Sequence, residues 1–174
     1  TAPAAAAAIV AETGADLGVC LDGDGDRCVA IDERGQVVDG DRLIGILALD
    51  RIRRGALANG YVVVSVLSNG GLEAAIRDAG GRVVRTPVGD KYIWEAMLVA
   101  DAGLGGEKSG HVIVRDRSTS GDGIVTALEL LDVLARAQRP LSVLAAEIPL
   151  YPQQQRTIPV RHKEQWEAEP TLSA

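Results

Sequence analysis

Residues 61–67 (YVVVSVL) constrain the fold of this chain more than any other stretch. The run is rich in β-branched residues and almost wholly apolar, which is typical of a central strand covered on both faces of a parallel sheet. The segment that follows, SNGGLEAAIRDAGG, has a Ser/Asn start, a helical interior and a Gly-Gly stop. A buried strand that leads into a capped helix predicts a βα unit.

The same alternation recurs along the chain. Further strands are predicted at 17–21, 28–31, 37–38, 82–85 and 112–114, with 17–21 buried and 37–38 returning as a hairpin. Further helices are predicted at 4–12, 41–53, 91–100 and 122–137, the last capped by Ser120 or Asp122, and within RPLSVLAAEIP. This order predicts an α/β fold with a mixed, largely parallel sheet and flanking helices.

Composition agrees with this fold and excludes some functions. Hydrophobic residues make up 47% of the 174, but Phe is absent, so the core is expected to consist of Val, Ile, Leu and Ala. The net charge of -6 argues against a nucleic-acid partner. No apolar run approaches the roughly 18 residues that span a bilayer. Cys20 and Cys28 lack metal-site or CxxC spacing, which favours free thiols in the cytoplasm.

The motif DGDGDR at 22–27 carries the clearest chemistry. Asp22, Asp24 and Asp26 alternate with glycine, and Arg27 follows directly. Crowded carboxylates raise each other's pKa unless a cation compensates them. Mg²⁺ prefers such oxygen ligands, and the glycines allow a turn on which the three side chains converge. The motif therefore predicts a magnesium site.

Three other interpretations of this motif remain open from the residues alone. It could be a solvated acidic turn. It could be a calcium loop of the EF-hand type with Glu33 at position 12, although Arg27 replaces the glycine required at position 6 and the flanks are predicted strands. It could also be a haloacid-dehalogenase-type phosphatase with Asp22 as nucleophile, although Thr126 stands where a metal-binding Asp is expected.

Five segments together resemble the α-D-phosphohexomutase family, in that family's order. DGDGDR is similar to its magnesium loop and GGEKSGHVI to its sugar-recognition loop. The other three are VVVSVLSNGGL, RTPVGDKYIWEAM and TSGDGIVTALELL. RTPVGDKYIWEAM is typical of the glucosamine branch. The resemblance covers nearly the whole chain, and the two loops together make it specific.

The resemblance implies a role for particular residues. Asp22, Asp24 and Asp26 would hold one Mg²⁺, and Arg27 would face the transferring phosphate unless it pairs with the carboxylates of its own loop. A second set would serve the sugar phosphate. In it, Glu107 and Ser109 would bind hydroxyls, His111 would assist proton transfer or bind phosphate, and Asp90 and Lys91 would approach the phosphate or only begin a helix.

The resemblance also implies a domain organisation. Residues 1–40 would be the C-terminal part of the family's second domain with the metal loop, 41–149 the third domain with the sugar loop, and 150–174 the start of the fourth. Neither a Ser-His-Asn-Pro nor a Ser-Gly-Thr motif occurs in the chain. The phosphoserine and the distal phosphate loop of the family would therefore lie elsewhere, and the chain alone is expected to be inactive.

For the whole protein, the resemblance implies interconversion of glucosamine 6-phosphate and glucosamine 1-phosphate through a hexosamine 1,6-bisphosphate. The partners would be these sugar phosphates, the remaining domains and, in a homodimer, a second copy of the protein. Mannose or glucose phosphates are the alternative substrates within the family.

Overall fold

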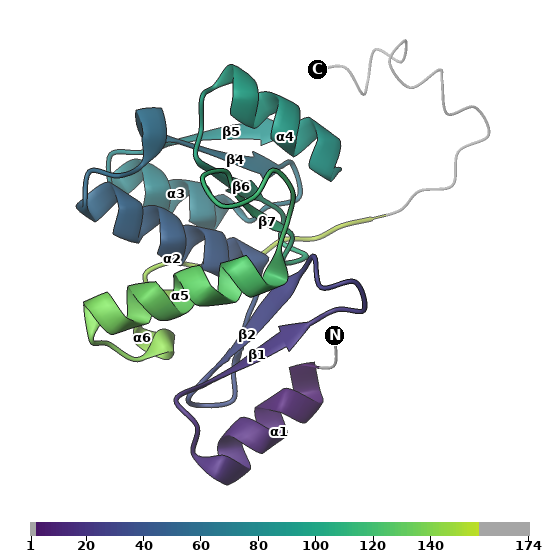
Figure 1. The fold of residues 1–174 in the computed structure, drawn as a ribbon, viewed down its shortest axis with the longest axis vertical. Helices are drawn as coiled ribbons and strands as arrows, with labels where there is room; N and C mark the ends of the chain where they lie inside the picture. Colours follow the sequence, from purple (N-terminus) through teal and green to yellow (C-terminus); the bar gives the residue numbers. More distant parts are fainter. Residues whose placement is uncertain (1–2, 157–174) are drawn as a thin grey trace, which may run out of the picture.

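The computed structural model describes residues 3–156, which form a four-stranded sheet with helices on both faces and a smaller three-stranded sheet (Figure 1). The larger sheet contains β4 (Tyr61–Ser65), β5 (Arg82–Thr86), β6 (Leu104–Gly106) and β7 (Val112–Val114). Its strand order is β5-β4-β6-β7. β4 pairs in parallel with β5 and β6, whereas β7 runs antiparallel to β6. The predicted mixed, largely parallel sheet is confirmed.

β4 is central and buried on both faces, as its composition predicts. Successive side chains of a strand point to opposite faces. Val62 and Val64 enter the main core, and Val63 packs with the residues of α4 (Asp90–Val99) and β7 on the other face. The strand ends at Ser65, two residues earlier than predicted, and the side chains of Val66 and Leu67 are exposed.

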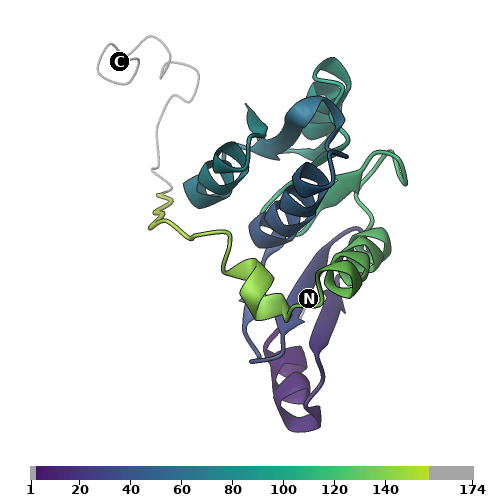
Figure 2. The same cartoon turned by 90° about the vertical axis from the view of Figure 1, so that its left-hand side faces the viewer.

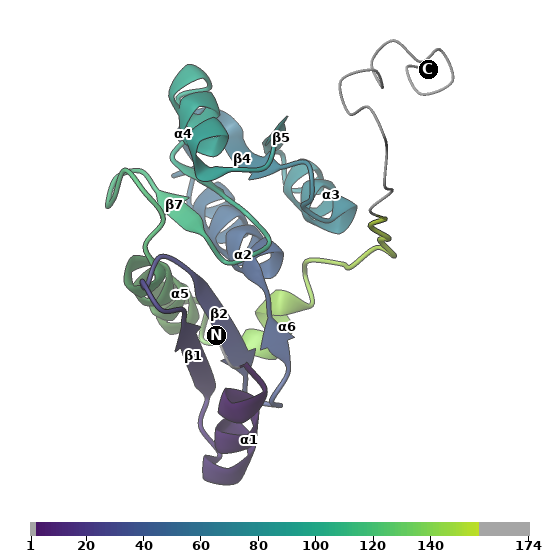
Figure 3. The same ribbon diagram turned by 90° about the vertical axis from the view of Figure 1, so that its right-hand side faces the viewer.

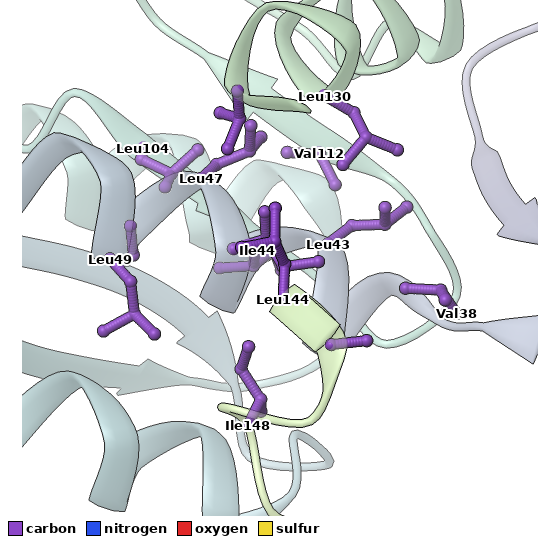
Figure 4. Packing of buried hydrophobic residues seen from close by; sticks show 14 of the residues in the cluster. Val38, Leu43, Ile44, Leu47, Leu49, Leu104, Val112, Leu130, Leu144 and Ile148 are labelled. Carbon is purple, nitrogen blue, oxygen red and sulfur yellow. The ribbon is translucent and has the colours of Figure 1, made fainter. Parts of the chain in front are cut away.

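The helix α2 (Gly40–Arg53) is the centre of the main core. α3 (Gly70–Asp78), α5 (Gly123–Ala137) and α6 (Leu141–Ala145) pack around it, as Figures 2 and 4 show. Its larger buried apolar side chains and one alanine form a continuous stretch of the core: Leu43, Ile44, Ile46, Leu47, Ala48 and Leu49. Because α2 touches a sheet and three helices, it has little exposed surface.

The smaller sheet joins β1 (Leu17–Leu21), β2 (Cys28–Asp32) and β3 (Val37–Val38) in antiparallel order, with α1 (Pro3–Thr13) packed against it. The prediction that 17–21 is buried was wrong. Val19 is 39% exposed and Leu21 38% exposed. The reason is that β1 pairs only with β2 among the described residues, so it is an edge strand.

One further detail differs from the sequence prediction, and one open alternative is decided. β6 was not predicted, because a three-residue strand with two glycines (LGG) lacks β-branched residues. Asp122, and not Ser120, caps α5, since its side chain accepts hydrogen bonds from the amides of Ile124 and Val125. Within the described part of the chain, no helix is long and apolar enough to cross a membrane. After α6 the chain runs past α3 and leaves the fold (Figure 3).

Candidate functional site

The predicted metal loop is the connection between β1 and β2. One carboxylate oxygen from each of Asp22, Asp24 and Asp26 lies within 4.8 Å of the other two. The pairing of Leu21 with Cys28 brings the two ends of the loop together, so alternate side chains converge as the spacing predicts. Asp24 is exposed, and the other two are half-buried.

Arg27 lies beside two of these carboxylates. Its Nε is 3.6 Å from Asp22 Oδ2 and 3.7 Å from Asp26 Oδ1. Burial alone would raise the pKa of Asp22, but the hydrogen bond from the Arg27 amide and the Arg27 charge hold that pKa below its usual value. With 53% of its side chain exposed, Arg27 is also open to a ligand.

The donor set fits a hard divalent cation. Asp26 Oδ1 is buried and has no hydrogen-bond partner among the described residues. The Arg27 Nε lies 3.7 Å from this oxygen, too far for a hydrogen bond, so a metal ion could still serve as its partner. Three converging carboxylates with one such oxygen are the ligands that Mg²⁺ prefers.

Backbone hydrogen bonds fix the metal loop to the larger sheet and to α5. The Cys28 amide donates to the Gly110 carbonyl at 3.0 Å, and Arg27 forms an antiparallel bridge with His111. On the other side, the Gly123 amide donates to the Gly25 carbonyl at 2.8 Å. The two predicted loops are therefore in direct contact.

His111 links them through its side chain. The Gly121 amide donates to Nε2 at 3.2 Å, so this nitrogen accepts and the ring proton belongs on Nδ1. Nδ1 then donates to Asp26 Oδ2 at 3.0 Å. His111 is only 6% exposed and both ring nitrogens have partners inside the protein. This arrangement favours orientation of a metal ligand over direct contact with a substrate.

The sugar loop is a tight turn between β6 and β7. The Gly110 amide donates to the Glu107 carbonyl at 3.0 Å, and the Glu107 amide donates to the His111 carbonyl at 2.9 Å. Ser109 is exposed at the tip. Glu107 Oε1 accepts a hydrogen bond from the Gly89 amide at 3.1 Å, which leaves Oε2 for a ligand hydroxyl.

Asp90 and Lys91 lie at the first turn of α4, directly after Gly89. Both are exposed. The Glu107–Gly89 hydrogen bond therefore brings the start of α4 beside the sugar loop. Lys91 Nζ is 3.9 Å from Glu95 Oε1, a solvent-exposed pair that contributes little to stability. Both side chains are accessible to a ligand phosphate.

Two of the three alternative interpretations of the acidic motif, the calcium loop and the phosphatase, fit the geometry poorly. Glu33 lies in the turn after β2, at the opposite end of that strand from Asp22, and its carboxylate contacts Ser142. It does not complete a calcium loop. The phosphatase interpretation expects a buried apolar strand before Asp22, whereas β1 is a partly exposed edge strand whose hairpin with β2 the acidic loop closes. The relatives named below do not support the phosphatase either.

Some structurally important contacts were not predicted, although the residues that make them were partly assigned. Asn69 was expected only as a turn or cap residue, and it does cap α3. The buried carboxylate of Asp41 was expected only to begin a helix, yet it accepts a hydrogen bond from the Asn69 amide at 2.8 Å. The Gly121 contact with His111 also escaped prediction. The sole signal in the sequence was Asp41 itself, an acid at the start of an otherwise apolar helix.

Comparison with protein families places the larger sheet and its helices in one family. Residues 39–151 match the family model described as phosphoglucomutase/phosphomannomutase, alpha/beta/alpha domain III. The chain is 49% identical over 174 residues to the phosphoglucosamine mutase of Symbiobacterium thermophilum, which covers 100% of this chain and 39% of that protein. It is 56% identical over 137 residues to the phosphoglucosamine mutase of Thermotoga maritima, covering 79% of this chain and 32% of that protein.

Solved structures agree. A putative phosphomannomutase from Thermus thermophilus superimposes with a TM-score of 0.75 at 30% identity, covering 82% of this chain and 32% of that one. An N-acetylglucosamine-phosphate mutase in its apo form shares the fold, with a TM-score of 0.63 at 21% identity over 77% of this chain and 39% of that one. The chain therefore belongs to the phosphoglucomutase/phosphomannomutase family, the α-D-phosphohexomutases. It spans about 39% of the length of the Symbiobacterium relative.

Proposed function

We propose that the protein containing this chain is a phosphoglucosamine mutase, which interconverts glucosamine 6-phosphate and glucosamine 1-phosphate. The observation that carries the proposal is the 49% identity to a phosphoglucosamine mutase along the entire chain, both functional loops included. The direct contact between the acidic loop and the sugar loop supports it, because phosphoryl transfer needs the charged groups and the acceptor sugar in one place.

Each predicted site residue has a defined role in this proposal. Glu107 and Ser109 bind sugar hydroxyls, and Asp90 and Lys91 approach the phosphate of the substrate. Arg27 contacts the phosphoryl group in transfer, for which a planar guanidinium with several donors is suited. His111 keeps Asp26 in place through its Nδ1 proton, which is a positioning role.

Asp22, Asp24 and Asp26 would hold a magnesium ion. When bound, that ion would balance the negative charge of the phosphoryl group as a Lewis acid. The convergence of the carboxylates and the Asp26 Oδ1 atom, which is buried without a hydrogen bond among the described residues, support this assignment.

The wider role follows from the same proposal. A serine outside this chain carries the phosphoryl group, and a hexosamine 1,6-bisphosphate is the intermediate. The product serves amino-sugar and cell-wall precursor synthesis.

Free Cys20 and Cys28 support a reducing, cytoplasmic location. The remaining domains complete the site, the whole protein would form a homodimer, and the 174-residue chain by itself is inactive.

The test is a substrate comparison with the full-length protein. Magnesium-dependent isomerisation of glucosamine, mannose and glucose phosphates is measured, each with its own bisphosphate activator, and the 174-residue chain is the control. We expect the highest kcat/KM for glucosamine phosphate and no turnover by the short chain. A preference for mannose or glucose phosphate would keep the family and overturn the substrate. Turnover by the short chain would contradict the need for the other domains.

A further inference from the structure

A cleft of about 540 Å³ lies beside Ser109. It has three walls: the sugar loop, the β4–α3 turn and the segment 149–156 that leaves the fold after α6, called the exit segment below. Lys108 and Ser109 line the first wall, Val66 and Leu67 the second, and residues 153–155 the third. The exposed side chains of Val66 and Leu67 make the second wall apolar, whereas the side chains of the other two walls are polar.

Gln153 of the exit segment forms a hydrogen bond with each of the other two walls. Its Nε2 donates to the Leu67 carbonyl at 2.9 Å, and its Oε1 accepts from Lys108 Nζ at 3.4 Å. These are exposed contacts and are weak individually. The position of Gln153 must therefore be set by stronger contacts nearby.

Those contacts belong to Asn69, which is 4% exposed. Its side-chain amide pairs with the backbone of Tyr151 in both directions: Nδ2 donates to the carbonyl at 2.8 Å, and Oδ1 accepts from the amide at 2.9 Å. The same Oδ1 caps α3 by accepting from the Gly71 amide at 2.9 Å. The Asn69 side chain thus makes the two backbone hydrogen bonds that a neighbouring β-strand would make with Tyr151, and these bonds hold the exit segment.

Asp41 holds Asn69 in turn. Asp41 is fully buried, and its Oδ2 accepts from the Asn69 amide at 2.8 Å. Its Oδ1 and the nearby Ser68 Oγ are both buried, and neither meets the distance and angle of a full hydrogen bond with any described residue. Burial raises the pKa of Asp41, and the Asn69 amide and the Ser68 hydroxyl partly offset that rise. A buried carboxyl with so few partners is costly, so its presence at this position calls for a structural or functional reason.

Two glycines bring the sugar loop and the exit segment close to this pair. A Cβ at Gly40, next to Asp41, would lie 2.2 Å from the Glu107 carbonyl oxygen, so the sugar loop rests directly on the start of α2. A Cβ at Gly71, two residues after Asn69, would lie 1.8 Å from the Pro149 carbonyl oxygen, so the exit segment rests directly on α3. No larger residue fits either position without moving a wall.

We propose that Asp41 and Asn69 are positioning residues that hold the exit segment, the β4–α3 turn and the sugar loop at fixed distances around this cleft. Because the exit segment leads out of the larger-sheet unit, the pair also fixes the direction in which the chain continues toward the rest of the protein. The inference has a structural half and a catalytic half. The structural half, that the pair holds the exit segment, stands without the proposed function. The catalytic half, that this geometry serves substrate binding, rests on the proposed function.

The structural half is tested by amide hydrogen exchange on the 174-residue chain. Asn69→Ser retains a hydroxyl that can cap α3 but is too short to reach Tyr151. We expect the Tyr151 amide to exchange about tenfold faster while the α3 amides change little. Asp41→Ala should reproduce this effect, and Asp41→Asn, which keeps an acceptor for the Asn69 amide, should largely preserve protection. Tyr151 exchange within twofold of the unmodified chain in both Asn69→Ser and Asp41→Ala would overturn the proposal.

The catalytic half is tested by steady-state kinetics of the full-length protein with glucosamine phosphate. We expect Asn69→Ser to lower kcat/KM about tenfold, mainly through KM, and Asp41→Asn to restore most of the loss seen in Asp41→Ala. The matched control is Asn59→Ser, which removes the hydrogen bonds to Asp101 far from the cleft. Equal KM values for Asn69→Ser and Asn59→Ser would overturn the positioning role. If the unmodified full-length protein does not isomerise glucosamine phosphate, the proposed function is refuted. The hydrogen-exchange measurement would still decide whether Asp41 and Asn69 hold the exit segment.

Discussion

The two carboxylate oxygens of Asp26 have different surroundings. Oδ2 accepts a hydrogen bond from His111 at 3.0 Å, whereas Oδ1 is buried with no hydrogen-bond partner in the described part of the chain. Oδ2 is therefore held in place by His111, whereas Oδ1 has only the Arg27 guanidinium nearby, 3.7 Å away, and can accept a metal ion. Hydrogen bonds of this kind orient metal ligands, and their loss typically reduces metal affinity by about 10- to 100-fold.

At the residue scale we predict that His111→Ala weakens Mn²⁺ binding to the 174-residue chain by about tenfold or more. Mn²⁺ is the probe because its binding is followed directly by electron paramagnetic resonance. His111→Asn should recover part of the affinity, because an amide can still donate to Asp26. The control is Ser109→Ala on the same loop, whose side chain has no role in holding the carboxylates. Unchanged affinity in His111→Ala would remove His111 from the metal site.

At the scale of elements, the turn between β2 and β3 is tied to α6. The Ser142 amide donates to Glu33 Oε2 at 3.2 Å, and the Ser142 hydroxyl donates to Oε1. Burial alone would raise the pKa of Glu33, but the hydrogen bonds from the Ser142 side chain and backbone and the Arg34 charge lower it below its ordinary value of 4.5. Ionised Glu33 therefore stabilises the folded chain.

We predict that Glu33→Gln lowers the free energy of unfolding by about 1 kcal/mol at pH 7. Since the folded-state pKa is depressed, the contribution is complete above the unfolded pKa near 4.5 and is lost as the pH falls through the lower folded value. Urea unfolding at several pH values measures it. Glu12→Gln, which removes an exposed carboxylate of α1 without a hydrogen bond or ion pair to any described residue, controls for general charge effects. A difference between Glu33→Gln and the unmodified chain that grows as the pH falls would contradict this assignment.

At the scale of the whole molecule, the smaller sheet shares the main core with the larger one. Cys28, Ala30 and Val38 are fully buried in the same cluster as Leu43 of α2 and Leu130 of α5. The loop contacts at Gly25, Cys28 and His111 strengthen this association. The two sheets are therefore expected to unfold together, although only one of them matches the family model.

We predict a single cooperative transition for the 174-residue chain in differential scanning calorimetry. Removal of residues 1–38 should lower stability by about 3 kcal/mol or more, because it uncovers one side of α2 and α5. The shortened chain should also bind a hydrophobic dye that the longer one does not. Two separate transitions in the longer chain, with an unchanged melting temperature after truncation, would show that the sheets are independent.

The sequence by itself determined the features that depend on near neighbours. The apolar run 61–67 predicted the central strand, Asn69 and Asp122 predicted the helix starts, and the alternate spacing of Asp22, Asp24 and Asp26 predicted that their side chains converge. Strand periodicity, caps and tight turns all act within a few residues, so they can be recognised from the residues alone.

Only the tertiary structure decided the contacts between residues far apart in the chain. Asp26 and His111 are 85 residues apart, and Asn69 and Tyr151 are 82 apart. The same is true of β6, whose three residues have no strand pattern and become a strand only by pairing with β4 and β7. These features depend on packing around α2, because the close approach of the sugar loop to Gly40 and of the exit segment to Gly71 follows from the fold and not from local preference.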